Sequence, residues 1–166
     1  MKINRVWAMP NKCTFDIKPI KEFIYTHKKG HTLDMFAKDS KIADVTNDIN
    51  PNTLAEYHFD ALDFLKRLPD AHFDTILFDP PYSPRQIKEC YDSIGIPLTQ
   101  DKTKSSYWAN CKNEIIRIIK PGGTIISFGW SSQGMGKNRD CKITDILLVP
   151  HGGMHNDTIC VKEVKL

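Results

Sequence analysis

The stretch FDTILFDPPY, residues 73–82, decides how the rest of the chain is interpreted. Its first six residues are apolar or β-branched at every position except Asp74, which is typical of a strand buried on both faces of a sheet. An acid, two prolines and a tyrosine follow at once, so the strand opens directly into a stiff loop. GTIISFG (123–129) has the same apolar character. The two runs predict two central parallel strands.

Weaker patterns extend the sheet on both sides of these strands. HTLDMF (31–36), IADVTN (42–47) and EYHF (56–59) predict its first three strands. ITDILLVP (143–150) and DTICVKEV (157–164) flank a glycine-containing turn, which predicts a terminal antiparallel hairpin. The sheet should therefore have seven strands.

Two helical patterns lie between the strands. Leucines recur on one face of the segment 61–68, which ends at Pro69, and NEIIRIIK (113–120) stops at PGG (121–123). Strands that alternate with helices predict an α/β fold with a mostly parallel sheet covered on both faces. Ligands of such sheets bind beyond the carboxyl ends of the strands.

The composition fits a globular protein with one domain over residues 1–166. The net charge of +3 neither requires nor excludes a nucleic-acid partner, which would need a local basic patch. No apolar run reaches the length of a secretory signal or a membrane span, so we expect a cytoplasmic protein without membrane contact. The five cysteines are widely spaced and form no C-x-x-C pair, so we expect neither a disulfide framework nor a metal site.

The DPPY motif has the parts of a reader of aromatic amines. Its prolines hold the backbone stiff, so that the Asp79 carboxylate and the Pro80 carbonyl can face one target. Two acceptors can receive both hydrogens of an exocyclic NH2 group while the ring of Tyr82 stacks on the base. We therefore identify Asp79, Pro80, Pro81 and Tyr82 as the candidate catalytic residues. The alternative is a strand end that merely leads into a helix cap.

With DPPY after a central strand, the chain resembles the amino-methyltransferases that modify adenine N6, in particular the small phage-type DNA methyltransferases. The order of the preceding motifs is also similar: MPNKCTFDIKP (9–19), LDMFA (33–37), NDINP (47–51) and FDA (59–61). The resemblance implies a Rossmann-like class I methyltransferase fold without a separate target-recognition domain. It also implies that the cofactor is S-adenosylmethionine.

The same resemblance assigns the cofactor-binding residues. Asp34 would approach the methionine end, Asp48 would accept both ribose hydroxyls, and Asp60 would read the adenine amino group. The full implied set is Pro10, Phe15, Ile17, Asp34, Phe36, Ala37, Asp48, Ile49, Asp60 and Ala61. Taken singly, Asp34 could be a strand-end cap, Asp48 a turn residue and Asp60 the N-cap of the next helix. Phe15 could equally belong to the core.

The chain departs from the class in the first motif. FAKDSK (36–41) contains no glycine, although the backbone of that loop must approach the cofactor closely. Only thirteen residues separate Asp34 from Asp48, which leaves little room for a helix. The first crossover should therefore be short and irregular.

Candidate nucleic-acid contacts follow the catalytic motif. The segment 83–108 interleaves basic and aromatic residues, which suits phosphate contact and base stacking, although a solvated helix and loop would have a similar composition. The predicted contacts are Ser83, Arg85, Gln86, Lys88 and Trp130. Phe128 could line the base pocket or belong to the core. His151 and His155 are expected on the surface of the hairpin.

The sequence thus predicts methyl transfer to adenine N6 in DNA, with the target base flipped out of the helix. RNA methylation at adenine N6 or guanine N2 is the nearest alternative. A catalytically silent nucleic-acid-binding subunit is the alternative outside the enzymes. Without a separate recognition domain, sequence specificity would come from loops, oligomerisation or a partner subunit.

Overall fold

The computed structural model describes residues 1–166 and is built on a seven-stranded sheet with the order β1-β6-β7-β5-β4-β2-β3. The strands are β1 (Lys2–Arg5), β2 (Thr32–Asp34), β3 (Val45–Thr46), β4 (Phe73–Phe78), β5 (Ile119–Gly129), β6 (Cys141–Val149) and β7 (Thr158–Lys165). Neighbouring strands are parallel except at β7, which is antiparallel to both β5 and β6. The predicted mostly parallel sheet with a closing antiparallel hairpin is confirmed.

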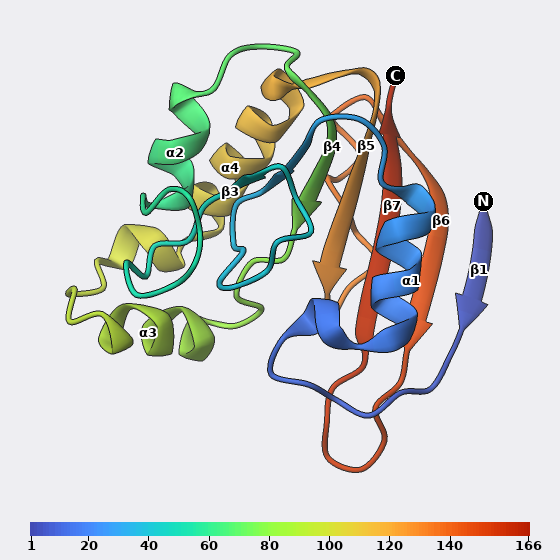
Figure 1. Cartoon of the computed structure of the whole chain (residues 1–166), viewed down its shortest axis with the longest axis horizontal. Helices are drawn as coiled ribbons and strands as arrows, with labels where there is room; N and C mark the ends of the chain where they lie inside the picture. Colours follow the sequence, from blue (N-terminus) through green and yellow to red (C-terminus); the bar gives the residue numbers. More distant parts are fainter.

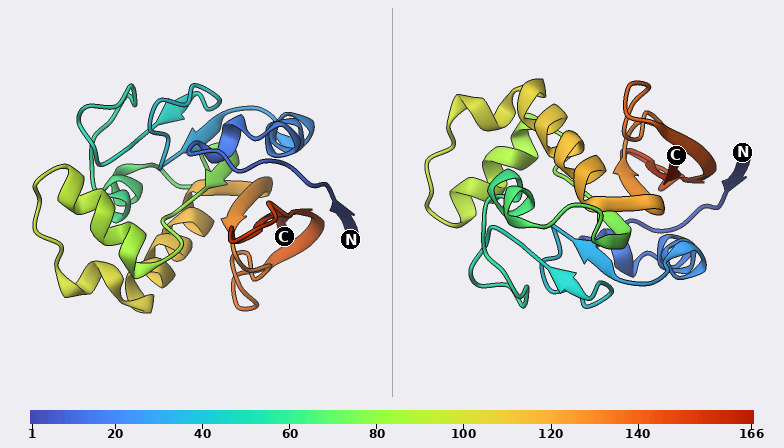
Figure 2. Two further views of the ribbon diagram at one scale, coloured as in Figure 1. Left: turned by 90° about the horizontal axis from the view of Figure 1, so that it is seen from below. Right: turned by 90° about the horizontal axis from the view of Figure 1, so that it is seen from above.

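Helices cover both faces of the sheet. They are α1 (Lys18–His27), α2 (Ala61–Arg67), α3 (Pro84–Ser93) and α4 (Ser105–Ile118), with short 3-10 turns η1 (Thr14–Asp16) and η2 (Gln100–Thr103). Figure 2, viewed along the strands, shows α1 on one side of the sheet and α2 with α4 on the other. None of these helices is long and apolar enough to cross a membrane.

The alternation of side chains along the central strands divides the core into two halves. In β4, Ile76 and Phe78 join the cluster that contacts α2 and α4, whereas Leu77 joins the cluster under α1. Ile125 and Ile126 of β5 divide in the same way. Each buried side chain of this size contributes roughly 1.5–3 kcal/mol. A strand buried on both faces must be apolar at every position, which is why these two runs were recognisable in the sequence.

The edges of the sheet differ from the prediction. The expected strand at 56–59 does not form, and Tyr57 makes only an isolated bridge to Asn47. The seventh strand is instead β1, whose four residues are all exposed and pair with β6. An edge strand without a buried face carries no apolar alternation and was missed for that reason. Helix α1 was also not predicted, although Ile20, Phe23 and Ile24 are buried on one of its faces.

Two connections bear on the site. As expected, no helix forms between β2 and β3, and turns span residues 35–44. The sequence predicted a helix that stops only at Pro121, but α4 ends at Ile118 and β5 begins at Ile119. Pro121, Gly122 and Gly123 therefore lie within the strand. Gly122 has φ +72 there, and the pairing of β4 with β5 shifts between Phe73 and Thr75.

The carboxyl ends of the parallel strands meet at one end of the molecule. Figure 1 shows the arrowheads of β4, β5 and β6 pointing to the end where α3, η1 and the β6–β7 loop also lie. In a sheet of this kind, that end is where ligands bind.

Candidate active site

A cavity of about 1100 Å³ lies beyond the carboxyl ends of the strands. It brings together fifteen of the predicted site residues, namely Pro10, Phe15, Ile17, Phe36, Ala37, Asp48, Ile49, Asp60, Ala61, Asp79, Pro80, Pro81, Tyr82, Gln86 and Trp130. The other four predicted residues do not line it: Asp34 is fully buried, and Ser83, Arg85 and Lys88 lie outside. Five segments far apart in the sequence therefore contribute to one space.

The DPPY loop is held by its own hydrogen bonds. Asp79 directly follows β4, and the hydroxyl of Tyr82 donates a hydrogen bond to its Oδ1 atom. The backbone N–H of Tyr82 donates to Oε1 of Gln86 at 2.6 Å, and the hydroxyl of Ser83 accepts from the backbone of Gln86 at 3.3 Å. Ser83 is therefore the N-cap of α3, with Pro84 in its first turn. The start of α3 fixes where the motif points.

Burial dominates the electrostatics of this pair. It raises the pKa of Asp79, while the hydrogen bond from Tyr82 and the positive charge of Lys38 act in the opposite direction. Burial and the adjacent carboxylate also raise the pKa of Tyr82, so the phenol stays protonated and remains a donor. A side-chain hydrogen bond from Thr14 also lowers the pKa of Asp79. The carboxylate that borders the cavity is therefore in contact with both Tyr82 and Thr14.

Two aromatic rings stand beside Asp79. Tyr82 and Trp130 meet edge to face, with ring centroids 5.6 Å apart and an interplanar angle of 64°. Trp130 is 44% exposed and lines the cavity. Phe128 does not reach it, because its ring packs against Phe15 in the core under α1 with the centroids 4.9 Å apart. Phe15 is both a core residue and a cavity-lining residue.

Asp34 ends β2 beneath the cavity and is completely buried. Its Oδ1 atom accepts a hydrogen bond from the backbone of Phe36 at 3.0 Å, as a strand-end cap would, but its Oδ2 atom has no partner. Burial raises the pKa of Asp34 to about 8, and the nearby acids Asp79 and Asp48 add to the effect. A buried carboxyl oxygen without a partner is costly, which marks this position as one that suits a ligand.

The glycine-free loop after Asp34 makes its turn at Lys38, whose φ is +50. This left-handed conformation costs a non-glycine residue roughly 1–2 kcal/mol. The backbone N–H of Lys38 donates to Oδ2 of Asp48 at 3.0 Å, and Oδ1 of Asp48 accepts from the backbone of Asn50 at 2.9 Å. Asp48 therefore fixes its own turn and the neighbouring loop, and each of its oxygens retains a lone pair for a ligand.

Asp60 is the N-cap of α2, as the structural alternative predicted, and it is also the centre of a polar cluster. It accepts hydrogen bonds from the hydroxyls of Tyr91 and Tyr107 at 3.0 Å, and Nζ of Lys102 lies 2.9 Å from its Oδ2 atom. Burial alone would raise the pKa of Asp60, but these contacts outweigh it and lower the pKa. These contacts connect Tyr91 of α3, together with Lys102 and Tyr107, to the N-terminus of α2.

Residues 83–108 were expected to present basic and aromatic side chains to nucleic acid, but three of these side chains point elsewhere. Tyr91, Tyr107 and Lys102 face Asp60 and not the solvent, because a buried carboxylate attracts the nearest donors. Arg85 and Lys88 remain exposed on α3, where Arg85 pairs with Glu89 at 2.8 Å. Both keep the properties of a solvent-facing phosphate contact, as does the exposed Lys104, which pairs with Asp101 at 3.0 Å.

His151 was wrongly expected on the surface. It is buried, with Nδ1 2.8 Å from the carbonyl oxygen of Ala8 and Nε2 2.8 Å from the hydroxyl of Thr158. The imidazole thereby joins the N-terminal segment to the start of β7. His155 is exposed, as expected, and also lines the cavity. The pattern HGGMHN gave no signal that one histidine faces inward.

Sequence reasoning also missed Lys38 as a site residue. It lines the cavity and its charge acts on Asp79. The signal was present, because Lys38 occupies a tight turn in which a glycine was expected and missing.

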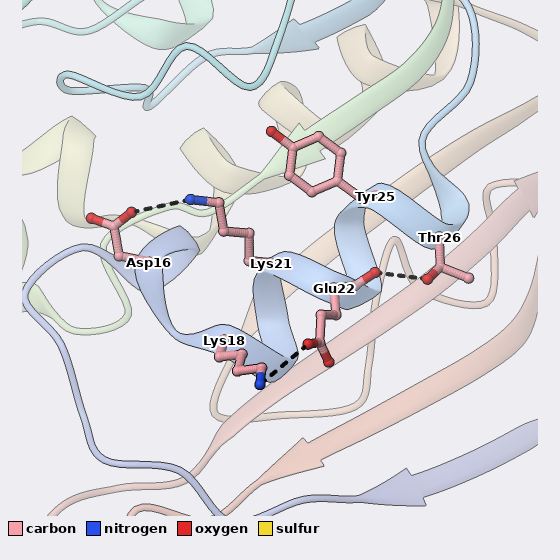
Figure 3. Close-up of a pocket in the computed structure, with 6 residues that line it drawn as sticks. All are labelled: Asp16, Lys18, Lys21, Glu22, Tyr25 and Thr26. Carbon is pink, nitrogen blue, oxygen red and sulfur yellow. Dashed lines mark hydrogen bonds and ion pairs between the residues drawn. The ribbon is translucent and has the colours of Figure 1, made fainter.

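A second hollow, of about 600 Å³, lies on the outer side of α1 and is drawn in Figure 3. Its side chains pair with one another: Nζ of Lys21 is 3.9 Å from Asp16, and Nζ of Lys18 is 4.0 Å from Glu22. These pairs are largely exposed to solvent and are worth little energetically. The hollow contains none of the predicted site residues and is a solvated surface.

Comparison with known proteins places the fold among methyltransferases. No protein-family model matches the chain. The type II methyltransferase M.BamHI of Bacillus amyloliquefaciens is 32% identical to it over 75 residues, which are 43% of this chain and 16% of that protein. The chain thus spans only a small part of that relative.

Solved structures match over most of the chain. The N-methyltransferase NodS of Bradyrhizobium japonicum has a TM-score of 0.59 at 8% identity, covering 89% of this chain and 92% of NodS. TrmN of Thermus thermophilus has a TM-score of 0.60 at 13% identity, covering 90% of this chain and 49% of TrmN. The 1,6-didemethyltoxoflavin-N1-methyltransferase of Burkholderia thailandensis, crystallised with S-adenosylhomocysteine, has a TM-score of 0.60 at 10% identity, covering 89% and 77%. The predicted Rossmann-like class I methyltransferase fold is confirmed.

Proposed function

We propose that the chain is an S-adenosylmethionine-dependent methyltransferase that acts on the exocyclic amino group of adenine in DNA. The observation that carries the proposal is the DPPY motif at the carboxyl end of β4, where the Asp79 carboxylate and the ring of Tyr82 line the cavity and Trp130 lies against Tyr82. An amine acceptor next to aromatic surface is the chemistry that an unpaired base requires.

The residues around the cavity fit the cofactor. Asp48 retains a lone pair on each carboxylate oxygen, which suits two ribose hydroxyls, and it lies close to the end of β3. The unpartnered Oδ2 atom of Asp34 suits the cationic amino group of the methionine end. Relatives in fold that were crystallised with S-adenosylhomocysteine support the same assignment. At Asp60, a cofactor amino group would share the carboxylate with Lys102 and the two tyrosines.

In the proposed mechanism the bound cofactor supplies an electrophilic methyl group. The target nitrogen would attack this methyl carbon, and the new N–C bond would form as the C–S bond breaks and S-adenosylhomocysteine leaves. The alkylated nitrogen would then lose a proton to water. Asp79 and the carbonyl of Pro80 accept the N–H hydrogens, which holds the lone pair of the amine in line with the methyl group. Because the alkylated nitrogen is cationic and acidic, Asp79 acts by orientation and electrostatics, and no strong base is required.

The target base must leave its helix to reach this cavity, unless it is met in a single strand. Tyr82 and Trp130 would replace the stacking that is lost, and each stacking platform is worth about 1–3 kcal/mol per base. Arg85 and Lys88, exposed just outside the cavity, are positioned to hold the backbone of the same strand. Recognition of a particular sequence would then need a partner subunit, a second copy or the loops around the cavity.

The test is transfer of radiolabelled methyl groups to DNA and RNA, followed by analysis of the labelled nucleosides. We expect N6-methyladenine from DNA, and about 100- to 1000-fold less label when Asp79 is replaced by Ala. Label in another base would retain the methyltransferase and reject adenine. Label in RNA alone would reject DNA. A chain that binds S-adenosylhomocysteine but labels neither polymer would favour a small-molecule methyltransferase or a silent subunit.

A further inference from the structure

We infer that Lys38 binds the carboxylate at the amino-acid end of the cofactor. The inference rests on the proposed function. It adds Lys38 to the cofactor site and gives a reason for a loop that contains no glycine. Lys38 has a φ of +50, a left-handed backbone conformation that favours glycine and is energetically unfavourable for lysine. A side chain that is retained in such a conformation needs a reason.

The amino-acid end of the cofactor is a zwitterion and needs one anion and one cation. Asp34 and Lys38 lie four residues apart on the same strand-end loop. The Oδ2 atom of Asp34 has no partner, and the ammonium of Lys38 makes neither a hydrogen bond nor an ion pair within the chain. Lys38 can supply the cation for the carboxylate, and a cationic amino group beside Asp34 would favour the ionised form of an acid whose pKa burial raises to about 8.

Other lysines also line the cavity, but they are less suitable. Lys102 is paired with Asp60, and Lys21 lies 3.9 Å from Asp16. Lys12 and Lys41 are unpaired and exposed, as Lys38 is, so exposure does not separate the three. Lys38 differs from them in that its charge lowers the pKa of Asp79. Its charge therefore acts on the acid of the catalytic motif.

Chemistry requires the amino-acid end to lie near Asp79. The methyl group must meet the target amine at Asp79, and the sulfur that carries this group is joined to the amino-acid carbon chain. The carboxylate is therefore only a few bonds from the reacting centre. A cation near Asp79 on the loop that follows β2 is positioned to receive it, and a charge-assisted hydrogen bond is among the stronger contacts available.

The test compares two probes, S-adenosylhomocysteine and 5′-methylthioadenosine, which lacks the amino-acid end. Calorimetry would measure both with the parent chain, with Lys38→Gly and with Lys38→Met, which retains most of the side-chain volume. Lys41→Ala is the matched control, since Lys41 is an exposed lysine of the same loop that also lines the cavity.

We expect both Lys38 variants to bind S-adenosylhomocysteine about tenfold or more weakly, as the loss of a hydrogen bond to a charged group predicts. Binding of 5′-methylthioadenosine should change by less than about twofold, and Lys41→Ala should change neither. Lys38→Gly should melt at a temperature equal to or above that of the parent, which excludes unfolding as the cause.

Three results would overturn the inference. If the Lys38 variants bind S-adenosylhomocysteine as tightly as the parent does, Lys38 does not contact the carboxylate. An equal loss for both probes would assign Lys38 to the shape of the loop. Weaker binding of a DNA oligonucleotide with unchanged S-adenosylhomocysteine affinity would make Lys38 a phosphate contact. If the parent binds neither probe, the proposed function itself fails, and the inference fails with it.

Discussion

The hydroxyl of Tyr82 donates a hydrogen bond to Oδ1 of Asp79, so the aromatic and acidic members of the DPPY motif act on each other before any ligand is bound. Burial raises the pKa of Asp79, and this hydrogen bond opposes the rise. In the proposed mechanism the tyrosine would therefore have a second role besides stacking, because its hydrogen bond favours the ionised form of Asp79.

Tyr82→Phe separates these two roles. The ring stays, while loss of the hydroxyl lets the pKa of Asp79 rise further, so the acid limb of kcat/KM should move to higher pH. A pH profile of methyl transfer measures this. Tyr91→Phe is the matched control, since it removes a tyrosine hydroxyl from Asp60 instead. An acid limb that stays in place in Tyr82→Phe would show that ionisation of Asp79 does not limit the reaction.

Asp79→Ala should reduce methyl transfer by about 100- to 1000-fold, as the loss of a preorganised electrostatic contact does elsewhere. S-adenosylhomocysteine affinity, measured by calorimetry, should stay within a few-fold, because the carboxylate faces the target amine. A variant that retains activity would reject the assigned role of the motif.

Asp48→Asn should weaken binding of S-adenosylhomocysteine by about tenfold or more and leave DNA binding unchanged, because a charged acceptor of ribose hydroxyls is lost. Asparagine keeps one oxygen acceptor for the turn that Asp48 stabilises. Calorimetry would measure the affinity for S-adenosylhomocysteine, and an oligonucleotide titration would measure DNA binding. Parent-like cofactor affinity would contradict the ribose assignment.

Asp34→Asn should change how stability depends on pH. Burial raises the pKa of Asp34 to about 8, so between pH 4 and 8 the native state holds a proton that the unfolded chain releases. The stability linked to Asp34 is full below about pH 4 and is lost as the pH rises towards 8. Relative to the variant, the parent should lose up to about 1.4 kcal/mol per pH unit in this range. Urea unfolding of both proteins from pH 5 to 9 measures it, and a difference independent of pH would disprove the raised pKa.

Arg85→Ala and Lys88→Ala should weaken DNA binding on every sequence and reduce the slope of log affinity against log salt by about 1 per lost contact. Sequence preference should survive, since phosphate contacts position without specifying. Lys18→Ala, an exposed lysine of α1, is the control. Unchanged slopes for both α3 variants would place the nucleic acid elsewhere, and the loop around His155 would be examined next.

The central strands were predictable from sequence because they depend on local pattern. Ile76 and Leu77 are buried on opposite faces, which forces a continuous apolar run, and DPPY follows at once. The N-terminal strand was not predictable. Lys2–Arg5 pairs with β6 through backbone groups alone, and its exposed side chains carry no pattern.

The polar cluster at Asp60 shows why site residues are harder to predict than strands. Its partners Tyr91, Lys102 and Tyr107 lie 31 to 47 positions away, so no spacing in the sequence connects them. Lys38 was missed for a different reason. The lack of glycine in this loop indicated only weaker cofactor binding, and the charge of the lysine that occupies the turn was not considered.

The position of β7 has a consequence for how the chain folds. This strand follows all the others in the sequence, yet it lies between β5 and β6 in the sheet. A growing chain that lacks β7 leaves one edge of β5 open, and the pair of β6 and β1 has no strand that joins it to the rest of the sheet. The pairing of β1 with β6 closes a loop of more than 130 residues, and such nonlocal pairing slows folding. During synthesis, the exposed edge of β5 is therefore the part of the molecule most open to aggregation, until β7 covers it.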